Sequence, residues 1–403
     1  MGPVAPVPRS FPVTSPPPEP RRTRQRKNRF KTVVVLLLLP LVLAFGAGEV
    51  WVRANKTDID LLSITGQRPG KNPMSPWAVV DAFGAYRGRP GFDKPAWGKS
   101  INSEGFISTP DLTVAKDPGT LRVVFLGGSS TAGQGGDLAD SDTWPWQVAE
   151  GLRAARPGQT IEFLNAGLGG YSTFESMGRL WARVRFFEPD VLVLCHGWNE
   201  LYYWKSSQMD DPTTWRRLAH GGWGFDGYMP KNPPLSPWFI DGLIQWSQLL
   251  TRARLHLSPR VTGEAGAGAL GGSGLRDHYD PRGADVWRTH LRLISATAEV
   301  IGAELFVAKQ PTLIVPDLAE DLREICQYSH HGFDHDAHVD AFDHLYRVID
   351  ETTAEDRVID LTGLSGRGDL FSDHVHPNPK GAGLIAELVT EALLKQSEVF
   401  GPR

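Results

Sequence analysis

The chain has 403 residues, of which 41% are hydrophobic, so it is long enough to bury a large core. Its 42 basic and 46 acidic side chains leave a formal net charge of −4, which argues against a nucleic-acid-binding surface on the body of the chain. The 2 cysteines allow at most one disulfide and support neither a thiolate metal site nor redox chemistry. Cys195 lies within an apolar run, which favours the role of a small buried hydrophobe.

The N-terminal segment differs in composition from the rest of the chain. Residues 1–31 combine a proline- and serine-rich stretch with a cluster of arginine and lysine, which predicts a disordered tail. Residues 32–52 are almost continuously apolar and predict a transmembrane signal anchor, with the basic flank on the cytoplasmic side and Glu49 reaching toward the interface. Cleavage as a signal peptide and burial as a helix of a soluble protein are the alternatives. The anchor would place the remaining chain on the extracytoplasmic side, in the periplasm or at the cell surface.

Residues 53–119 are interpreted as a linker and N-terminal extension, and residues 120–397 as one α/β domain. Within that domain, short apolar runs alternate with amphipathic stretches. Strands are predicted at 121–128, 160–167, 190–197, 304–310 and 356–361, and helices at 143–156, 173–187, 286–303 and 379–396. Apolar strands separated by helices predict a parallel sheet covered on both faces.

Two long insertions, at about 200–282 and 311–353, interrupt this alternation, and insertions after the strands of α/β folds usually shape the binding crevice. The first contains several tryptophans, which predict either stacking platforms for sugar rings or a small satellite core. The second places His331, His335 and His338 at helical spacing. A metal site and a substrate-facing lid are alternatives there, and a solvent-exposed helix face is the favoured interpretation.

The stretch VVFLGGSSTAGQG, residues 123–135, ends an apolar run in glycines and hydroxyl side chains. It has neither the lysine of a phosphate-binding loop nor the GxGxxG spacing of a dinucleotide-binding turn. A strand that ends this way places Ser129 at the carboxyl edge of the sheet, where it is a candidate nucleophile or, alternatively, a helix cap. Because GxSxG is missing, the nucleophile elbow of the α/β-hydrolase fold is not favoured.

A serine nucleophile needs a base and hydrogen-bond donors for the developing oxyanion. In the stretch FSDHVHPNPKG, Asp373 precedes His376 by three residues and can orient its ring, while His374 is the competing base. Gly170 follows the second predicted strand and offers a backbone N–H. Asn199 follows the third and offers a side-chain amide. Because the carboxyl ends of parallel strands share one edge, a single crevice can collect these segments.

Four short blocks resemble those of the SGNH (GDSL-type) hydrolase superfamily: GGSST at Ser129, NAGLGG at Gly170, GWNE at Asn199, and DHVHP near the C-terminus. The resemblance covers about residues 100–396. The stretch INSEGF, which starts at Ile101, resembles a segment that precedes the first block in membrane-anchored bacterial members. The resemblance implies a three-layer α/β/α sandwich of flavodoxin-like type, with a parallel sheet of about five strands.

The same resemblance implies a catalytic triad, with Ser129 as nucleophile, His376 as base and Asp373 as the partner of the histidine. It also implies an oxyanion hole formed by the backbone N–H of Ser129, the backbone N–H of Gly170 and the side-chain amide of Asn199. No metal and no organic cofactor are implied.

Two positions depart from the family pattern. Gly128 stands where the first block often has aspartate, and Glu200 stands where the third block often has aspartate. Neither departure changes the residues that are expected to do the chemistry. The departure at Gly128 leaves the subfamily open.

The expected function is that of an exported serine esterase, a carboxylic ester hydrolase that works through an acyl-serine intermediate. Small-molecule esters and O-acetyl groups on carbohydrate are the expected substrates. An O-acyltransferase acting on an envelope polysaccharide and a non-catalytic glycan-binding protein on the same scaffold are the alternatives. The expected partners are the ester substrate and, through one N-terminal helix, the membrane, with no nucleic acid. The sequence leaves the oligomeric state open.

Overall fold

The computed structural model describes most of the chain from residue 21 to residue 400. The described ranges are 21–55, 61–64, 78–81, 83–92, 98–134, 138–204, 225–226, 229–230, 238–257 and 275–400. The chain divides into two compact units, one formed by residues 1–59 and 240–257 and the other by residues 60–239 and 258–403. We describe each unit by itself.

The smaller unit is helical. Its helices are α1 (Arg21–Asn55), α7 (Asp241–Ile244) and α8 (Gln248–Leu257). Because α1 begins at Arg21, it includes the basic segment that the sequence predicts as part of a disordered tail. The Glu49 carboxylate accepts hydrogen bonds from the backbone N–H groups of Gln248 and Leu249, at 2.9 Å each. These N–H groups have no partner within α8 because they begin it, so Glu49 serves as the cap of that helix.

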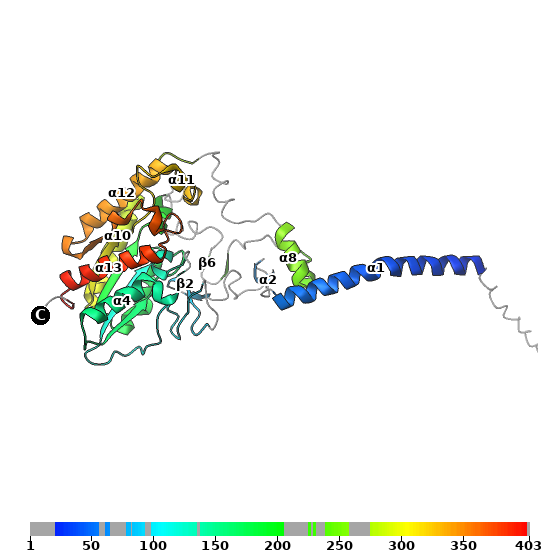
Figure 1. The fold of residues 1–403 in the computed structure, drawn as a ribbon, viewed down its shortest axis with the longest axis horizontal. Helices are drawn as coiled ribbons and strands as arrows, with labels where there is room; N and C mark the ends of the chain where they lie inside the picture. The colour runs from blue at the N-terminus through cyan, green and yellow to red at the C-terminus, as the bar shows by residue number, and fades with distance from the viewer. Residues whose placement is uncertain are drawn as a thin grey trace, which may run out of the picture. The chain divides into compact units, whose positions relative to one another are not determined.

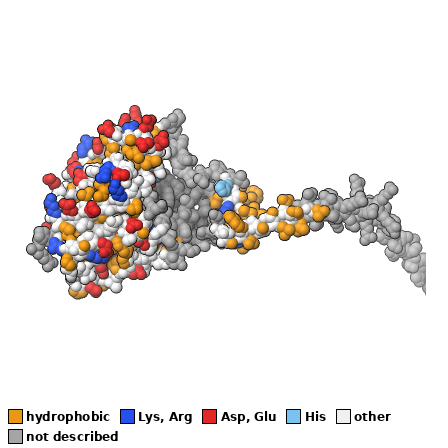
Figure 2. Space-filling view, viewed as in Figure 1, with side chains coloured by type: hydrophobic (Ala, Val, Ile, Leu, Met, Phe, Trp, Pro, Cys, Tyr) orange, Lys and Arg blue, Asp and Glu red, His pale blue; other side chains and the backbone are white. Residues whose placement is uncertain are grey.

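The apolar run that predicts a membrane anchor, residues 32–52, lies within α1. The large apolar side chains described along this helix are mostly exposed, and Figure 2 shows them in orange. Among the residues that the structure describes, none of the helices is both long enough and apolar enough to span a bilayer.

The larger unit is built on a parallel sheet of five strands. The strands are β3 (Leu121–Gly127), β4 (Ile161–Asn165), β5 (Val191–His196), β8 (Glu304–Lys309) and β9 (Val358–Asp360). Their order across the sheet is β4-β3-β5-β8-β9, and Val123 on β3 pairs with Phe163 of β4 on one side and with Val191 of β5 on the other. All five strands lie within the ranges that the sequence predicts, which confirms the parallel α/β assignment.

Helices cover both faces of this sheet. The long ones are α4 (Trp144–Ala155), α5 (Thr173–Ala182), α10 (Gly283–Ile301), α12 (His335–Thr352) and α13 (Pro379–Gln396). In Figure 1, α13 lies beside α4, and these two helices pack together, whereas α10 contacts both α5 and α12. The helices thus form two groups, α4 with α13 and α10 with α5 and α12. Right-handed crossovers put these groups on opposite faces of the sheet, because the chain moves one way from β3 to β4 and the other way from β4 to β5. The predicted three-layer α/β/α sandwich is therefore confirmed.

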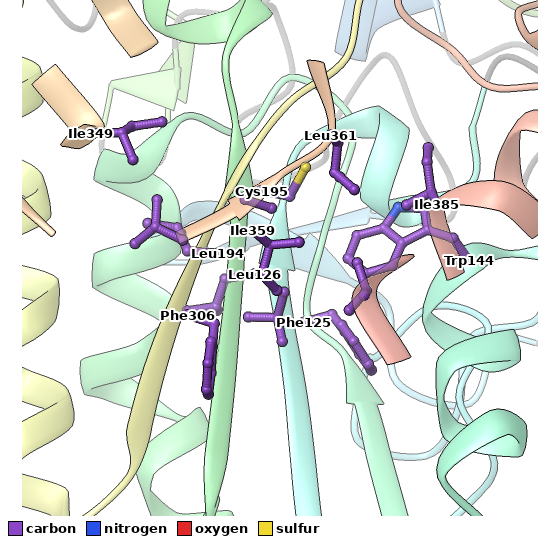
Figure 3. Packing of buried hydrophobic residues seen from close by; sticks show 14 of the residues in the cluster. Phe125, Leu126, Trp144, Leu194, Cys195, Phe306, Ile349, Ile359, Leu361 and Ile385 are labelled. Carbon is purple, nitrogen blue, oxygen red and sulfur yellow. The ribbon is translucent and has the colours of Figure 1, made fainter. Parts of the chain in front are cut away.

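The core fills the space between the sheet and its helices, as Figure 3 shows. Phe125 on β3 meets Trp144 on α4 edge to face, with 5.1 Å between the ring centroids. Cys195 on β5 is 3% exposed and is a free thiol, as is Cys326. Burial raises the pKa of Cys195 to about 12, so this side chain stays a neutral thiol in the core.

Several smaller elements complete the larger unit. A hairpin of β1 (Ala78–Asp81) and β2 (Ala85–Gly88) lies in the N-terminal extension, where the sequence predicts no strand. The remaining short helices and strands are α2 (Leu61–Ile64), α3 (Ser129–Ala132), α11 (Glu320–Arg323), β6 (Phe225–Asp226) and β7 (Met229–Pro230). The 3₁₀ turns are Asp140–Asp142, Val184–Phe187, Trp198–Trp204, Tyr328–His330, Glu355–Arg357, Thr362–Leu364 and Gly368–Leu370.

The tryptophans of the first insertion have different environments. Trp204 is fully buried and packs against Tyr279, with 5.0 Å between the ring centroids. In contrast, Trp246 is 78% exposed. Trp215 and Trp223 lie outside the described residues. Trp204 therefore belongs to the main core, and the sugar-stacking interpretation of the insertion stays a prediction.

Candidate active site

The order of the strands reverses at β3, which makes the carboxyl end of this strand a topological switch point of the sheet. From β3 the chain passes to β4 on one side, and from β4 it returns to β5 on the other side. Ser129 follows β3 directly and begins α3. Ligands of open α/β sheets bind at such a switch point, so the fold places Ser129 where ligands are expected.

At this edge, Ser129, His376 and Asp373 form a continuous chain of hydrogen bonds. His376 Nε2 lies 2.7 Å from Ser129 Oγ, and His376 Nδ1 lies 2.7 Å from Asp373 Oδ2. The histidine and aspartate side chains are 17% and 24% exposed, so the group is sheltered but open to a small molecule. The structure therefore brings together the three residues that the sequence predicts as a triad, in the order that general-base catalysis needs.

The local backbone holds Asp373 in place. Its Oδ1 atom accepts hydrogen bonds from the backbone N–H groups of Val375 and His376, at 2.9 Å each. The backbone N–H of Ser372 donates to the His376 carbonyl at 2.8 Å, which closes the turn. Burial opposes ionisation of Asp373, but the His376 ring and the two backbone N–H groups together hold its pKa well below the ordinary value. Asp373 is therefore a carboxylate throughout the neutral range and can fix the His376 ring with a proton on Nδ1.

The competing base, His374, lies in a different environment. It is 2% exposed and packs against Trp198, with 4.0 Å between the ring centroids. Within the described chain, neither of its ring nitrogens has a hydrogen-bond partner. Burial lowers the pKa of His374 to about 4, so the ring is neutral near pH 7. His374 packs in the core, and His376 is the histidine that contacts Ser129.

The candidate oxyanion donors Gly170 and Asn199 follow β4 and β5, the strands on either side of the one that leads to Ser129. The N–H of Ser129 is the first of α3 and has no acceptor within that helix. Gly170 has a φ of +77°, a left-handed conformation that favours glycine. Asn199 is 8% exposed, and its Nδ2 donates to the Tyr171 carbonyl at 2.8 Å. An amide NH₂ group has two donor hydrogens, so the Asn199 amide keeps a second hydrogen that can bind a ligand.

Gly128 stands where the first block of the SGNH pattern often has aspartate. Its contacts explain why a side chain does not fit at this position. A Cβ atom at position 128 would lie 2.8 Å from Asn199 Nδ2 and 3.1 Å from the Tyr171 carbonyl oxygen. Both distances are shorter than ordinary contacts of a Cβ atom, and one of the two neighbours is backbone. Gly128 therefore leaves room for the Asn199 amide beside the residue that precedes Ser129.

We expect Gly128→Ala to lower kcat, because the added methyl group displaces the Asn199 amide. A misplacement of about 1 Å can cost on the order of 100-fold in rate. The measurement is kcat and KM with a nitrophenyl ester. Gly363→Ala is the control, because a Cβ atom there meets no atom within 4 Å. If the two variants show equal rates, the Gly128 contact has no bearing on the site.

The hairpin of the N-terminal extension braces the loop that contains Gly170. The Tyr86 hydroxyl donates to the Gly169 carbonyl, and the Tyr171 hydroxyl donates to the Tyr86 carbonyl. The two tyrosine rings meet edge to face, with 5.3 Å between their centroids. The sequence gives no motif for this contact, so the supporting role of Tyr86 emerges only in the structure.

Gln310 is a second residue of the site that sequence analysis missed. It follows β8, and its Oε1 accepts a hydrogen bond from the Trp198 backbone N–H at 2.7 Å. Its Nε2 donates to Ser130 Oγ at 2.9 Å, and Ser130 Oγ donates to the Val375 carbonyl, also at 2.9 Å. Gln310 thus links the Trp198 turn, the nucleophile helix and the triad loop. Its place at the end of the strand predicted over 304–310 is the signal that could have found it.

The histidine-rich insertion is neither an exposed helix face nor a recognisable metal site. His331, His335 and His338 are 1%, 7% and 0% exposed, so the favoured interpretation from sequence is wrong. His331 Nδ1 lies 3.1 Å from His338 Nε2, and His335 Nε2 lies 2.9 Å from the Val315 carbonyl oxygen. In the described ranges, there is no group of three or more His, Cys, Asp or Glu side chains arranged to hold a metal ion. His331 and His338 pack against Trp198 and against each other, whereas His335 packs against Tyr328.

Comparisons with known proteins give matches at the level of solved structures alone. No protein-family model matches the sequence, and no curated protein matches it. An acetyl xylan esterase is 16% identical, with a TM-score of 0.38, over 68% of this chain and 100% of its own. A lipase/acylhydrolase from Enterococcus faecalis is 16% identical, with a TM-score of 0.37, over 68% of this chain and 95% of its own. An acetylxylan esterase from Geobacillus stearothermophilus is 14% identical, with a TM-score of 0.35, over 70% and 95%.

These similar structures are described as esterases or a lipase/acylhydrolase. The chemistry of this chain follows from the residues of its own site. In this site, hydrogen bonds join a serine hydroxyl to a histidine and the histidine to a carboxylate. Three candidate oxyanion donors follow neighbouring strands at the same edge of the sheet.

Proposed function

We propose that this chain is a serine-dependent carboxylic ester hydrolase of the SGNH (GDSL) type. One observation carries the proposal: the unbroken contact from Ser129 Oγ through the His376 ring to Asp373, with 2.7 Å at each step. A serine hydroxyl is a weak nucleophile until an adjacent base removes its proton, and this arrangement supplies that base with an orienting carboxylate.

The reaction proceeds in two halves. His376 Nε2 takes the proton of Ser129 as Oγ attacks the ester carbonyl, and the resulting tetrahedral adduct bears the oxyanion. When the C–O bond of the ester breaks, the protonated His376 gives its proton to the departing alcohol and leaves an acyl-serine. In the second half, His376 deprotonates a water molecule that attacks the acyl carbon. The carboxylic acid is released and Ser129 regains its proton.

The oxyanion is held by the backbone N–H groups of Ser129 and Gly170 and by the side chain of Asn199. We expect Asn199→Ala to lower kcat by about 100- to 1,000-fold and to change KM little, because this donor stabilises charge that develops in the transition state. Steady-state kinetics measure the effect, and thermal unfolding shows whether loss of the bond to Tyr171 has destabilised the fold. A folded variant with the kcat of the parent would remove Asn199 from the oxyanion hole.

For the substrate we propose a small acyl ester, with O-acetyl groups on carbohydrate as the first class to test. Two of the similar structures are described as acetylxylan esterases, so acetylated xylan belongs in the substrate panel. Nitrophenyl esters from acetyl to long-chain acyl complete the panel, and the full chain is assayed beside Ser129→Ala. Serine-dependent release of acetate or nitrophenol supports the proposal. A folded protein that releases neither would contradict it.

We further propose that the enzyme is exported and anchored on the extracytoplasmic side of a membrane. The sequence supports this, because a basic cluster precedes the apolar run of residues 32–52. Fractionation of cells that express the full chain, followed by protease treatment of intact spheroplasts, tests it. Recovery in the membrane fraction with a protease-sensitive site domain is expected. A protease-resistant domain that is digested only after lysis would place it in the cytoplasm.

A further inference from the structure

A buried polar cluster lies behind the two segments that carry the candidate oxyanion donors. Glu200 and Thr173 are both 0% exposed. Glu200 follows Asn199 in the Trp198–Trp204 turn, and Thr173 begins α5, just after the Gly170 loop. A carboxyl group is almost never fully buried unless it has hydrogen-bonded partners, so its contacts here need an explanation.

The contacts of Glu200 are directed at one residue. Its Oε1 atom accepts a hydrogen bond from the Thr173 backbone N–H at 2.7 Å, and its Oε2 atom shares a hydrogen bond with Thr173 Oγ1 at 2.8 Å. Two residues earlier in the chain than Thr173, the Tyr171 carbonyl accepts the 2.8 Å hydrogen bond from Asn199. Two neighbouring residues of the Trp198–Trp204 turn therefore hold the segment that leads into α5. Asn199 bonds to Tyr171, and Glu200 bonds to Thr173.

This pairing connects two donors that come from different strands. Gly170 follows β4 and Asn199 follows β5, and no strand–strand pairing joins these two, because β3 lies between them. The distance between the Gly170 N–H and the Asn199 amide is then set by what ties their segments together. An oxyanion hole loses most of its effect when its donors are about 1 Å out of place.

We infer that Glu200 is a positioning residue, which fixes the oxyanion hole by clamping the Asn199 turn to the start of α5 through Thr173. The inference rests on the proposed esterase function. The length of the side chain is part of it: aspartate, one methylene shorter, could not reach both the N–H and the hydroxyl of Thr173 from the same backbone position. This reach explains why glutamate stands at position 200, where the third block of the SGNH pattern often has aspartate.

The surroundings indicate that Glu200 acts as a neutral acid. The groups that face the clamp are His196, whose Nδ1 lies 3.7 Å from Glu200 Oε1, His290, whose Nδ1 lies 2.8 Å from Thr173 Oγ1, and the Tyr203 hydroxyl. Burial raises the pKa of Glu200 to about 8 and lowers the pKa of His196 to about 3. Both groups are mainly uncharged at pH 7. In the neutral acid, the Oε2 hydroxyl donates to Thr173 Oγ1, which can donate in turn to His290 Nδ1. Glutamine keeps this pattern, because its Oε1 accepts from the Thr173 N–H and its Nε2 donates to Thr173 Oγ1.

The kinetic test compares Glu200→Gln, Glu200→Ala and Glu200→Asp in the full chain. We expect the alanine and aspartate variants to lose about 10- to 100-fold in kcat with little change in KM, because the donors shift while the substrate surface remains. Glutamine should recover most of the rate. Glu162→Ala is the matched control, since it breaks a partly buried ion pair with Arg122 at the opposite, amino end of the sheet. It should lower thermal stability without lowering kcat.

A second measurement does not depend on turnover. Amide hydrogen exchange, followed by mass spectrometry, reports the protection of peptides that cover 169–174 and 197–201. We expect Glu200→Ala to raise exchange in both peptides and Glu200→Gln to leave both protected, while Glu162→Ala changes neither.

The two arms separate the possible failures. Equal protection in the alanine variant and the parent would overturn the clamp, whether or not the protein hydrolyses esters. If the parent shows no serine-dependent turnover, the proposed function fails while hydrogen exchange still decides the clamp. A variant with raised exchange but unchanged kcat in an active enzyme would overturn the link between the clamp and catalysis. Should the alanine variant not fold, the aspartate variant is compared with glutamine in both measurements.

Discussion

Ser129→Ala is expected to lower kcat for ester hydrolysis by roughly five to six orders of magnitude, because no other group then forms the acyl intermediate. The folded structure should be little affected, since Ser129 Oγ has one described hydrogen bond, to His376 Nε2. Thermal unfolding and circular dichroism check that point. The kinetic measurement is initial-rate hydrolysis of nitrophenyl acetate by the full chain.

Ser130→Ala is the matched control for this experiment. Ser130 is the neighbouring hydroxyl and donates to the Val375 carbonyl, with no described bond to His376. Its loss should cost far less than the loss of Ser129, because it supports the loop without reacting. Full activity of Ser129→Ala would contradict the nucleophile assignment. Folded parent protein without hydrolysis would instead favour acyl transfer to a polysaccharide or glycan binding.

Asp373→Asn should lower kcat by about 10,000-fold with the backbone turn preserved. An amide oxygen can still accept the two N–H bonds that Asp373 Oδ1 accepts now. Its NH₂ group, however, would face His376 Nδ1 as a donor, so the ring keeps its proton on Nε2. That tautomer cannot take the proton of Ser129.

The pH–rate profile and the rate itself are the measurements for Asp373→Asn. Asp369→Asn is the control, because Asp369 is an exposed carboxylate nearby in the chain that pairs with Lys380. We expect the control to keep the kcat of the parent. A loss of less than tenfold in Asp373→Asn would mean that His376 is oriented by other groups.

The fold could be predicted from sequence because buried parallel strands are recognisable as short, nearly continuous apolar runs. The strand predicted over 190–197 is observed as Val191–His196, and every residue of it is buried. The terminal helix predicted over 379–396 has the same bounds in the structure, with Asn378 as its cap. The β1–β2 hairpin could not be predicted, because four-residue strands in an extension carry too little periodicity.

The candidate site was predictable where its residues directly follow strands. Ser129, Gly170 and Asn199 are reached from the carboxyl ends of three neighbouring strands, so their order in the sequence already places them together. Their supports were not predictable in the same way. The bonds from Glu200 to Thr173 and from Gln310 to Ser130 depend on side-chain reach between distant segments, which no local pattern encodes.

The exposed helix face that the sequence predicts in the histidine-rich insertion is buried in the structure. Histidines at helical spacing predict a polar, solvent-exposed helix face. In the structure, however, His335 and His338 lie on the same side of α12 as the buried Phe342 and Leu345. Their nitrogens find local partners, such as the Asp334 carbonyl oxygen 2.8 Å from His338 Nδ1. Burial with satisfied hydrogen bonds makes a histidine part of the core, and the sequence does not reveal those partners.

In the proposed reaction Ser129 carries the acyl group during turnover, so the decisive experiment is to trap the acyl-serine. The full chain is mixed with a nitrophenyl ester, quenched in acid within the first turnovers, digested and analysed by mass spectrometry. We expect one added acyl group on the peptide that contains Ser129 and none in Ser129→Ala. An acyl group on another residue, or serine-dependent hydrolysis without any acyl-serine under conditions where deacylation is rate-limiting, would contradict it.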